Sequence, residues 1–203
     1  VKVDRTDGFL GPVQVEITGM PPGFSVTSPI EIQAGHYQAH GMIFAAQDAP
    51  TPTEENSQTS QVTATATVDG SQATKSVASV GQIKLAGEPK LLINLDVPGQ
   101  QITIAPGQTV SAVLRVERRN FADRVKSEAR NLPHGVYVDN IGLNGILVVE
   151  GKLERTIYIT AAKWVPETSR TFFIQVTDEG NPTSPPVTLH VRKPLEVADN
   201  TSP

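Results

Sequence analysis

The sequence predicts an all-β fold of two tandem β-sandwich domains, and three observations support this. The chain of 203 residues repeats itself at an offset of 112 to 116 residues. Its apolar residues alternate with polar ones over short runs, which is the period of a half-buried strand. Sixteen glycines and sixteen prolines separate those runs, as turns between many short strands require. No segment of a dozen residues has helical periodicity.

The internal repeat is the strongest of the three observations, because its matches fall in chain order. The matched segments are Val1–Arg5 with Leu114–Arg118, Gly19–Val26 with Asn131–Val138, and Ile32–Pro50 with Val148–Pro166. The offset is four residues larger in the third pair of segments than in the second. We therefore expect a short insertion in the second copy, near Asp139–Gly145.

The repeat also predicts the domain boundaries. We expect a first domain at 1–86, a second at 87–193 and a flexible C-terminal tail at 194–203. The best linker is Gly87-Glu-Pro89, which is short and stiffened by proline. The second copy has two strand-like segments ahead of its first matched strand, and no such segments precede Val1. The first domain is therefore expected to lack its N-terminal strand.

The expected strands follow from alternation and from turn signals. Three segments alternate along their length, namely Val13–Ile17, Val110–Val116 and Leu153–Ala161. In the third, Leu153 shares the predicted apolar face with Ile157 and Ile159. Val62–Val68 precedes Asp69-Gly70, a strong hairpin signal, and Thr171–Val176 forms the equivalent hairpin with Val187–Val191. Short strands at this spacing favour the immunoglobulin-like, or fibronectin III-like, sandwich plan, with about seven to nine strands in each copy.

Composition excludes several classes of function. The net charge is −4, so the chain offers no basic surface for nucleic acid. No apolar run approaches the roughly 20 residues that span a bilayer. The absence of cysteine removes disulfides, thiolate nucleophiles and cysteine-based zinc sites. We expect no cofactor and no catalytic residues, because no nucleophile elbow, phosphate loop or grouped Ser, His and Asp motif is present.

Glycine and proline recur in a pattern that resembles a known class of repeats. Gly8-Phe9, Gly11-Pro-Val13 and Gly19-Met-Pro-Pro-Gly23 follow Arg5, and Asn131-Leu-Pro-His-Gly135-Val136 echoes the last of them. This pattern resembles the immunoglobulin-like repeats of large exported bacterial proteins of planctomycete type. The resemblance implies a spacer, adhesion unit or accessory binding module at the cell surface or outside the cell, with its signal sequence elsewhere. The expected partners are neighbouring domains of the same polypeptide, another protein or a glycan.

Few residues suggest a metal site. His36 and His40 would lie too far apart on one strand to share a metal, so we interpret them as solvated strand histidines. Carboxylates and an amide in turns could hold calcium, but none has the dense spacing of a known calcium loop, and solvated turn acids are the better interpretation. The calcium candidates are Asp4, Asp7, Glu88, Asp96, Asp178, Glu179 and Asn181. No metal site is therefore predicted.

Two further features remain open. Asp4–Arg5 and Glu117–Arg118 recur at equivalent strand ends, where we expect either an exposed salt bridge or a bond to a loop carbonyl. Trp164 is the one candidate ligand contact, because aromatic side chains on sandwich loops stack on sugar rings. The first copy has Asp48 at that place, and packing at the core edge or between domains is the competing interpretation of Trp164. The three tyrosines are scattered and form no evident platform with it.

A non-catalytic structural or interaction module is therefore the leading hypothesis. The alternative is an accessory carbohydrate-binding module that uses Trp164. Exposure of the indole among polar neighbours would favour the alternative, and burial would favour the spacer.

Overall fold

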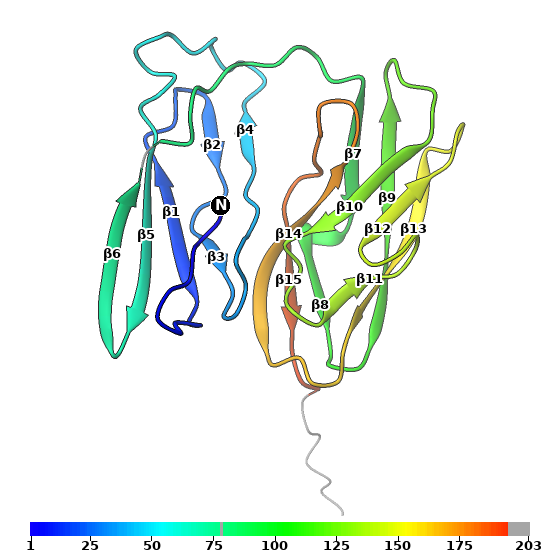
Figure 1. The fold of residues 1–203 in the computed structure, drawn as a ribbon. Helices are drawn as coiled ribbons and strands as arrows, with labels where there is room; N and C mark the ends of the chain where they lie inside the picture. Colours follow the sequence, from blue (N-terminus) through cyan, green and yellow to red (C-terminus); the bar gives the residue numbers. More distant parts are fainter. Residues whose placement is uncertain (78, 195–203) are drawn as a thin grey trace, which may run out of the picture. The chain divides into compact units, whose positions relative to one another are not determined.

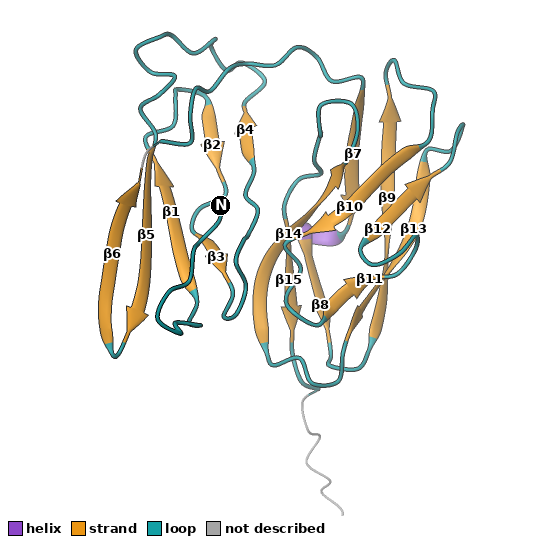
Figure 2. Ribbon diagram, in the orientation of Figure 1, coloured by secondary structure: helices purple, strands orange, loops and turns teal. Residues whose placement is uncertain are grey.

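A computed structural model describes residues 1–77 and 79–194, so nearly all of the predicted tail lies outside the described residues. Contacts between Cα atoms divide the chain into two compact units, Val1–Gly87 and Glu88–Pro203. Within the described residues both units are built from strands, and one 3-10 turn at Pro98–Gln100 is the exception (Figure 2). The predicted all-β, immunoglobulin-like class is confirmed.

The first unit contains two sheets (Figure 1). Its strands are β1 (Val13–Thr18), β2 (Phe24–Val26), β3 (Ile30–Ile32), β4 (Ile43–Ala45), β5 (Gln61–Val68) and β6 (Ser71–Val77). One sheet has the order β3-β1-β5-β6 and the other is the pair β2-β4. Val1–Val3 contributes a single isolated bridge, Lys2 to Gln38, so the six strands among the described residues fall one short of the lower end of the expected seven to nine.

The second unit is larger, and its two sheets contain five and four strands. The strands are β7 (Leu91–Asp96), β8 (Gln101–Ile104), β9 (Thr109–Arg118), β10 (Val125–Arg130), β11 (Val136–Val138), β12 (Gly145–Val148), β13 (Glu154–Ala161), β14 (Thr168–Val176) and β15 (Val187–Val191). The sheet orders are β12-β10-β14-β15-β8 and β11-β13-β9-β7. Among the pairs formed by these strands, β15 with β8 is parallel.

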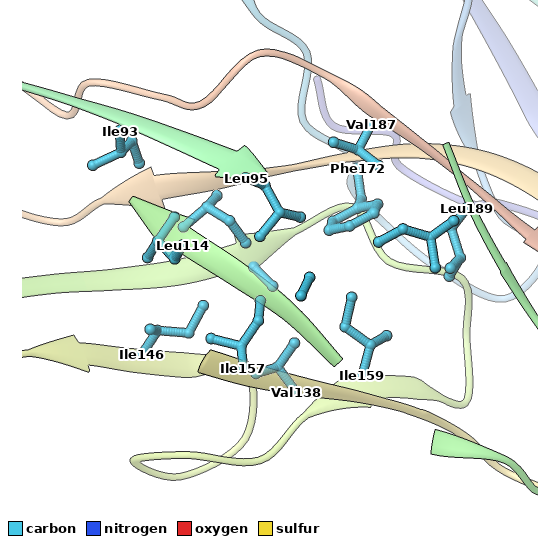
Figure 3. Close-up of a cluster of buried hydrophobic side chains, with 14 of the residues drawn as sticks. Ile93, Leu95, Leu114, Val138, Ile146, Ile157, Ile159, Phe172, Val187 and Leu189 are labelled. Atoms are coloured by element: carbon cyan, nitrogen blue, oxygen red, sulfur yellow. The ribbon is translucent and has the colours of Figure 1, made fainter. Parts of the chain in front are cut away.

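The core of the second unit lies between its two sheets. Alternation along β7 and β9 points Leu95 and Leu114 inward, where both are almost fully buried. The opposing sheet contributes Phe172 and Leu189, which are also buried (Figure 3). The first unit has a much smaller cluster around Val15 and Ile32, so burial of apolar area stabilises the second unit more strongly.

The strand registers reproduce the sequence repeat. In the first unit Val13 pairs with Ile32, and in the second Val125 pairs with Val148. Phe24 with Ala45 corresponds in the same way to Val136 with Ala161. The partners differ by 112 residues on one strand and by 116 on the other, which are the offsets read from the sequence. The two units therefore share a backbone plan in these strand pairs.

The predicted insertion lies in the loop between β11 and β12, and this loop closes on itself. The Asn144 amide nitrogen donates to the Val138 carbonyl oxygen at 2.7 Å, and the Asn144 side chain accepts from the Val138 amide at 2.9 Å. Asp139 forms a bridge with Leu143. The extra residues therefore satisfy their own backbone groups and leave both flanking strands in register.

The face predicted for Leu153 is wrong. Alternation places this residue on the apolar face of its strand, but it is 59% exposed. Regular pairing of β13 begins after it, at Glu154, and Glu154 and Arg155 are exposed as well. Inward alternation is established only from Ile157, so the strand end lies at the rim of the sandwich, where an inward register buries nothing.

Candidate functional site

Arg5 fastens three segments of the first unit together. Its Nε donates to the carbonyl oxygen of His36 at 2.8 Å, and its two terminal nitrogens donate to those of Gly11 at 2.7 Å and Gln33 at 3.1 Å. The guanidinium carbon also lies 5.6 Å from the centre of the Phe9 ring. The donors of a guanidinium are spread over three nitrogens in a fixed plane and so reach carbonyls of separate segments, whereas the three donors of a lysine share one nitrogen.

Arg118 makes the same contacts in the second unit. Its Nε donates to Lys152 at 3.1 Å, one terminal nitrogen to Asp123 at 2.6 Å and the other to Val149 at 3.2 Å, in each case to the backbone oxygen. A further bond reaches the carbonyl oxygen of Phe121 at 3.2 Å. Of the two alternatives left open by the sequence, both arginines form the bond to loop carbonyls, and Glu117 forms its salt bridge with Arg119 instead. Each such arginine with its carbonyl partners is called an arginine clamp below.

The two arginine clamps correspond atom for atom. The acceptors in the first unit are matched in the second at the repeat offsets, His36 by Lys152 and Gly11 by Asp123. A backbone bond beside the clamp is also repeated, because the Val3 amide donates to Tyr37 at 3.0 Å and the Val116 amide to Leu153 at 2.7 Å. The repeated arginine is therefore explained by the fold, since both units use it to hold their loops.

Trp164 is exposed at one end of the second unit, with 61% of its surface open to solvent. It lies in the turn after β13, and its neighbour Val165 is buried in the core. The indole faces the exposed ring of His134, with 5.1 Å between ring centroids and an interplanar angle of 50°. Val165 therefore packs at the edge of the core, whereas most of the Trp164 side chain is exposed to solvent.

The indole of Trp164 packs against the backbone of Gly135. A Cβ at this position would clash with the Cη2 atom of Trp164 and would lie 2.7 Å from Cγ2 of Val165. The backbone of Gly135 also has a positive φ of 83°, which favours glycine. Gly23 occupies the same place in the first unit, against Ala49. The turn is thus a shared feature, and the tryptophan on it is specific to the second unit.

Two tyrosines lie on the outer face of the four-stranded sheet of the second unit. Tyr137 pairs with Thr160 across β11 and β13, and Tyr158 lies two residues before Thr160 on the same strand. Residues two apart on a strand share a face. Tyr158 is 56% exposed and Tyr137 is half-buried. Tyr37, which is 60% exposed, belongs to the first unit.

An open, polar hollow of about 590 Å³ lies beside the arginine clamp of the second unit. It is lined by Phe121, Asp123, Arg124, Lys126, Glu150, Asp178 and Glu179. Arg118 holds one of its walls, through the backbone oxygens of Phe121 and Asp123. Asp123, Glu150 and Asp178 are exposed, so they lack the burial that equips a carboxyl group as a general acid.

Two of the calcium candidates, Glu179 and Asp96, are paired with cations. Glu179 forms an ion pair of 2.7 Å with Lys90. Asp96 accepts a hydrogen bond of 2.9 Å from Arg115, which also bonds Glu154 at 2.8 Å. The hydrogen bond and charge of Asp96, and then the charge of Glu154, raise the pKa of Arg115 above its ordinary value. Within residues 1–77 and 79–194, no three His, Asp or Glu side chains are grouped so that they could hold a metal ion.

His36 and His40 differ from the prediction. Both are half-buried, and both lie in an irregular segment between β3 and β4. The segment is held by the Arg5 bond to the His36 carbonyl. The strand geometry assumed for the pair therefore does not apply.

In the described part of the chain, no helix is long and apolar enough to cross a membrane.

No protein-family model matches the sequence, and neither does any curated protein sequence. Among solved structures, the chain is similar to the fibronectin(III)-like modules of Clostridium thermocellum CbhA, with 11% identity, 94% of this chain and 82% of that chain covered, and a TM-score of 0.28. It is also similar to SGBP-B of the Bacteroides ovatus mixed-linkage glucan utilization locus, solved with a mixed-linkage heptasaccharide. There the identity is 16%, the coverage 93% of this chain and 45% of that chain, and the TM-score 0.24. Similarities this weak carry no argument about function.

Proposed function

We propose that the chain is a non-catalytic structural and interaction module, a pair of spacer or adhesion repeats within a larger exported bacterial protein. The observation that supports this most directly is that both units repeat the same strand registers and the same arginine clamp. The features that the two units share, the strand registers and the arginine clamp, stabilise the fold. Repeats of this kind set a distance between neighbouring domains when the linker between them is stiff.

A distance measurement tests the spacer role. The chain has no cysteine, so spin labels can be placed at Gln72→Cys and Asn94→Cys, two exposed strand positions, one in each unit. A stiff pair gives a narrow distribution of label distances by double electron–electron resonance. The Pro89→Gly variant, which loosens the linker, gives a broader one. A distribution as broad in the parent chain as in Pro89→Gly would contradict the spacer role.

Carbohydrate binding at Trp164 is the second candidate function, and the 61% exposure of the indole favours it. An aromatic face that is open to solvent offers the C–H groups of a sugar ring a large contact at low entropic cost. The His134 ring and the Gly135 backbone hold the indole in place. A glycan is therefore the ligand that this surface fits best.

A glycan array screen of the parent chain beside Trp164→Ala tests this candidate. Trp164 is the only tryptophan, so a glycan that stacks on it also changes the intrinsic fluorescence. We expect binding by the parent chain and loss of at least about tenfold in affinity in the variant. Circular dichroism shows whether both proteins are folded. Equal binding by the two would exclude Trp164 as the contact.

A further inference from the structure

We propose that the outer face of the sheet β11-β13-β9-β7 carries an extended aromatic strip, formed by Trp164, Tyr137 and Tyr158, that binds a linear β-1,4-linked polysaccharide of glucose or xylose. The proposal rests on the second candidate function and adds the length, chemistry and direction of the site.

The register places the two tyrosines next to each other. Tyr137 is directly opposite Thr160, and Tyr158 is the next residue of β13 on the same face. Such diagonal neighbours lie about 7–8 Å apart. The residues on either side of each tyrosine, such as Val136 and Ile157, are buried in the core, so both tyrosine rings are on the solvent side of the sheet.

Trp164 continues the strip past the end of β13. Its ring lies against Gly135, which is two residues before Tyr137. The Ala162 amide donates to the Gly135 carbonyl oxygen at 2.9 Å, so the two segments stay paired up to the turn that carries the indole. The indole therefore lies just past the end of the β11 and β13 pair, beyond Tyr137 along the strands.

Hydroxyl groups lie beside the aromatic strip. Tyr158 is opposite Ser111 on β9, and the hydroxyls of Thr160 and Thr109 are hydrogen-bonded to each other at 2.8 Å. Threonine and serine hydroxyls can exchange hydrogen bonds with sugar hydroxyls while the rings stack. Arg115, a cation on this sheet face opposite the first residue of β13, is already paired with Asp96 and Glu154, so the strip fits a neutral glycan.

The shape of the strip determines the form of the ligand. The polar hollow lies at the loops before β10 and β13, at the opposite end of β13 from Trp164. The hollow is therefore not part of the strip, whose tyrosines lie on the surface of the sheet. In a β-1,4-linked chain of glucose or xylose the substituents are equatorial, which leaves flat faces of C–H groups. Such a ribbon can contact several rings in a row, and its affinity depends on its length.

The first unit repeats the β11 and β13 pair as β2 and β4, but without the strip. At the repeat offsets its residues are Ser25, Met42 and Asp48, where the second unit has Tyr137, Tyr158 and Trp164. The fold therefore does not require aromatic side chains at these places. The first unit also supplies a matched control, because Tyr37 is about as exposed as Tyr158 and lies outside the strip.

Calorimetric titration of the full chain with cello-oligosaccharides and xylo-oligosaccharides, from disaccharide to hexasaccharide, tests the proposal. We expect affinity to rise with chain length. Tyr158→Ala should lower the affinity for the hexasaccharide about tenfold and leave the disaccharide almost unaffected, whereas Tyr158→Phe and Tyr37→Ala should bind as the parent does. Trp164→Ala should weaken binding of every length.

The binding data distinguish failure of the aromatic strip from failure of the second candidate function. If Trp164→Ala loses binding but Tyr158→Ala and Tyr137→Ala bind the hexasaccharide as the parent chain does, the aromatic strip is refuted and the single-residue site stands. If binding is independent of Trp164, the second candidate function itself is refuted. If the parent chain binds no oligosaccharide of either series, the strip is refuted, and the glycan array then decides whether Trp164 binds another sugar.

Discussion

Replacing Phe172 by alanine is expected to lower the free energy of unfolding of the second unit by about 3–5 kcal/mol, the usual cost of removing a buried phenylalanine. The ring is fully buried and contributes to the core between the two sheets (Figure 3). Strands on either side of the ring are fixed by their ladders, so they cannot close the space that the ring leaves. The cost is therefore loss of apolar burial plus a cavity.

Urea unfolding with hydrogen exchange measures this effect, because exchange of the β14 and β15 amides reports on the second unit alone. Leu153→Ala is the control, since Leu153 is 59% exposed and its truncation should change the free energy of unfolding by less than about 0.5 kcal/mol. The core assignment would be wrong if the two variants lost similar stability.

Arg118→Lys is expected to destabilise the second unit by about 2–3 kcal/mol. The arginine donates four hydrogen bonds to backbone oxygens at 2.6 to 3.2 Å, and each bond from a charged donor contributes about 1.5 kcal/mol or more when its acceptor is shielded from water. Three of the four bonds are exposed to solvent and the fourth is part-buried, so the total is well below the sum. A lysine keeps the charge but cannot span the carbonyls.

The neighbouring Arg119 provides the comparison for Arg118. Arg119 pairs with Glu117 at the surface, so Arg119→Lys should change stability by less than about 1 kcal/mol. Arg5→Lys should reproduce the Arg118→Lys effect in the first unit, because its contacts are equivalent. Faster exchange confined to the loops around each clamp would support the assignment. Unchanged stability in both clamp variants would show that water replaces the guanidinium without cost.

The fold is largely predictable from the sequence, because alternation and repetition act on many residues at once. Val13–Thr18 and Val110–Val116 alternate between buried and exposed residues. Adding the repeat offsets to Val13 and Ile32, which pair in the first unit, gives Val125 and Val148, which pair in the second. A one-residue slip would turn a whole strand inside out, so the two copies must keep the same register wherever both bury one face. Where burial ends, as at Leu153, the pattern no longer determines the side chain's position.

The candidate surfaces are harder to predict, because they depend on backbone geometry that no pattern of residue types in the sequence indicates. The partners of Arg118 are carbonyl oxygens, which every residue has. The exposure of Trp164 depends on the turn geometry that separates it from the buried Val165. Tyr137 and Tyr158 are 21 residues apart in sequence, and only the register of β11 on β13 brings them to one face.

The loop between β11 and β12 shows how such a domain can diversify. Its four additional residues are held by hydrogen bonds within the loop, such as that from the Asn144 amide to Val138, and pairing on either side is the same as in the shorter copy. Length at this place is thus uncoupled from the architecture. A lineage of these domains is free to vary this loop as an antibody varies its hypervariable loops, without re-optimising the framework that carries it.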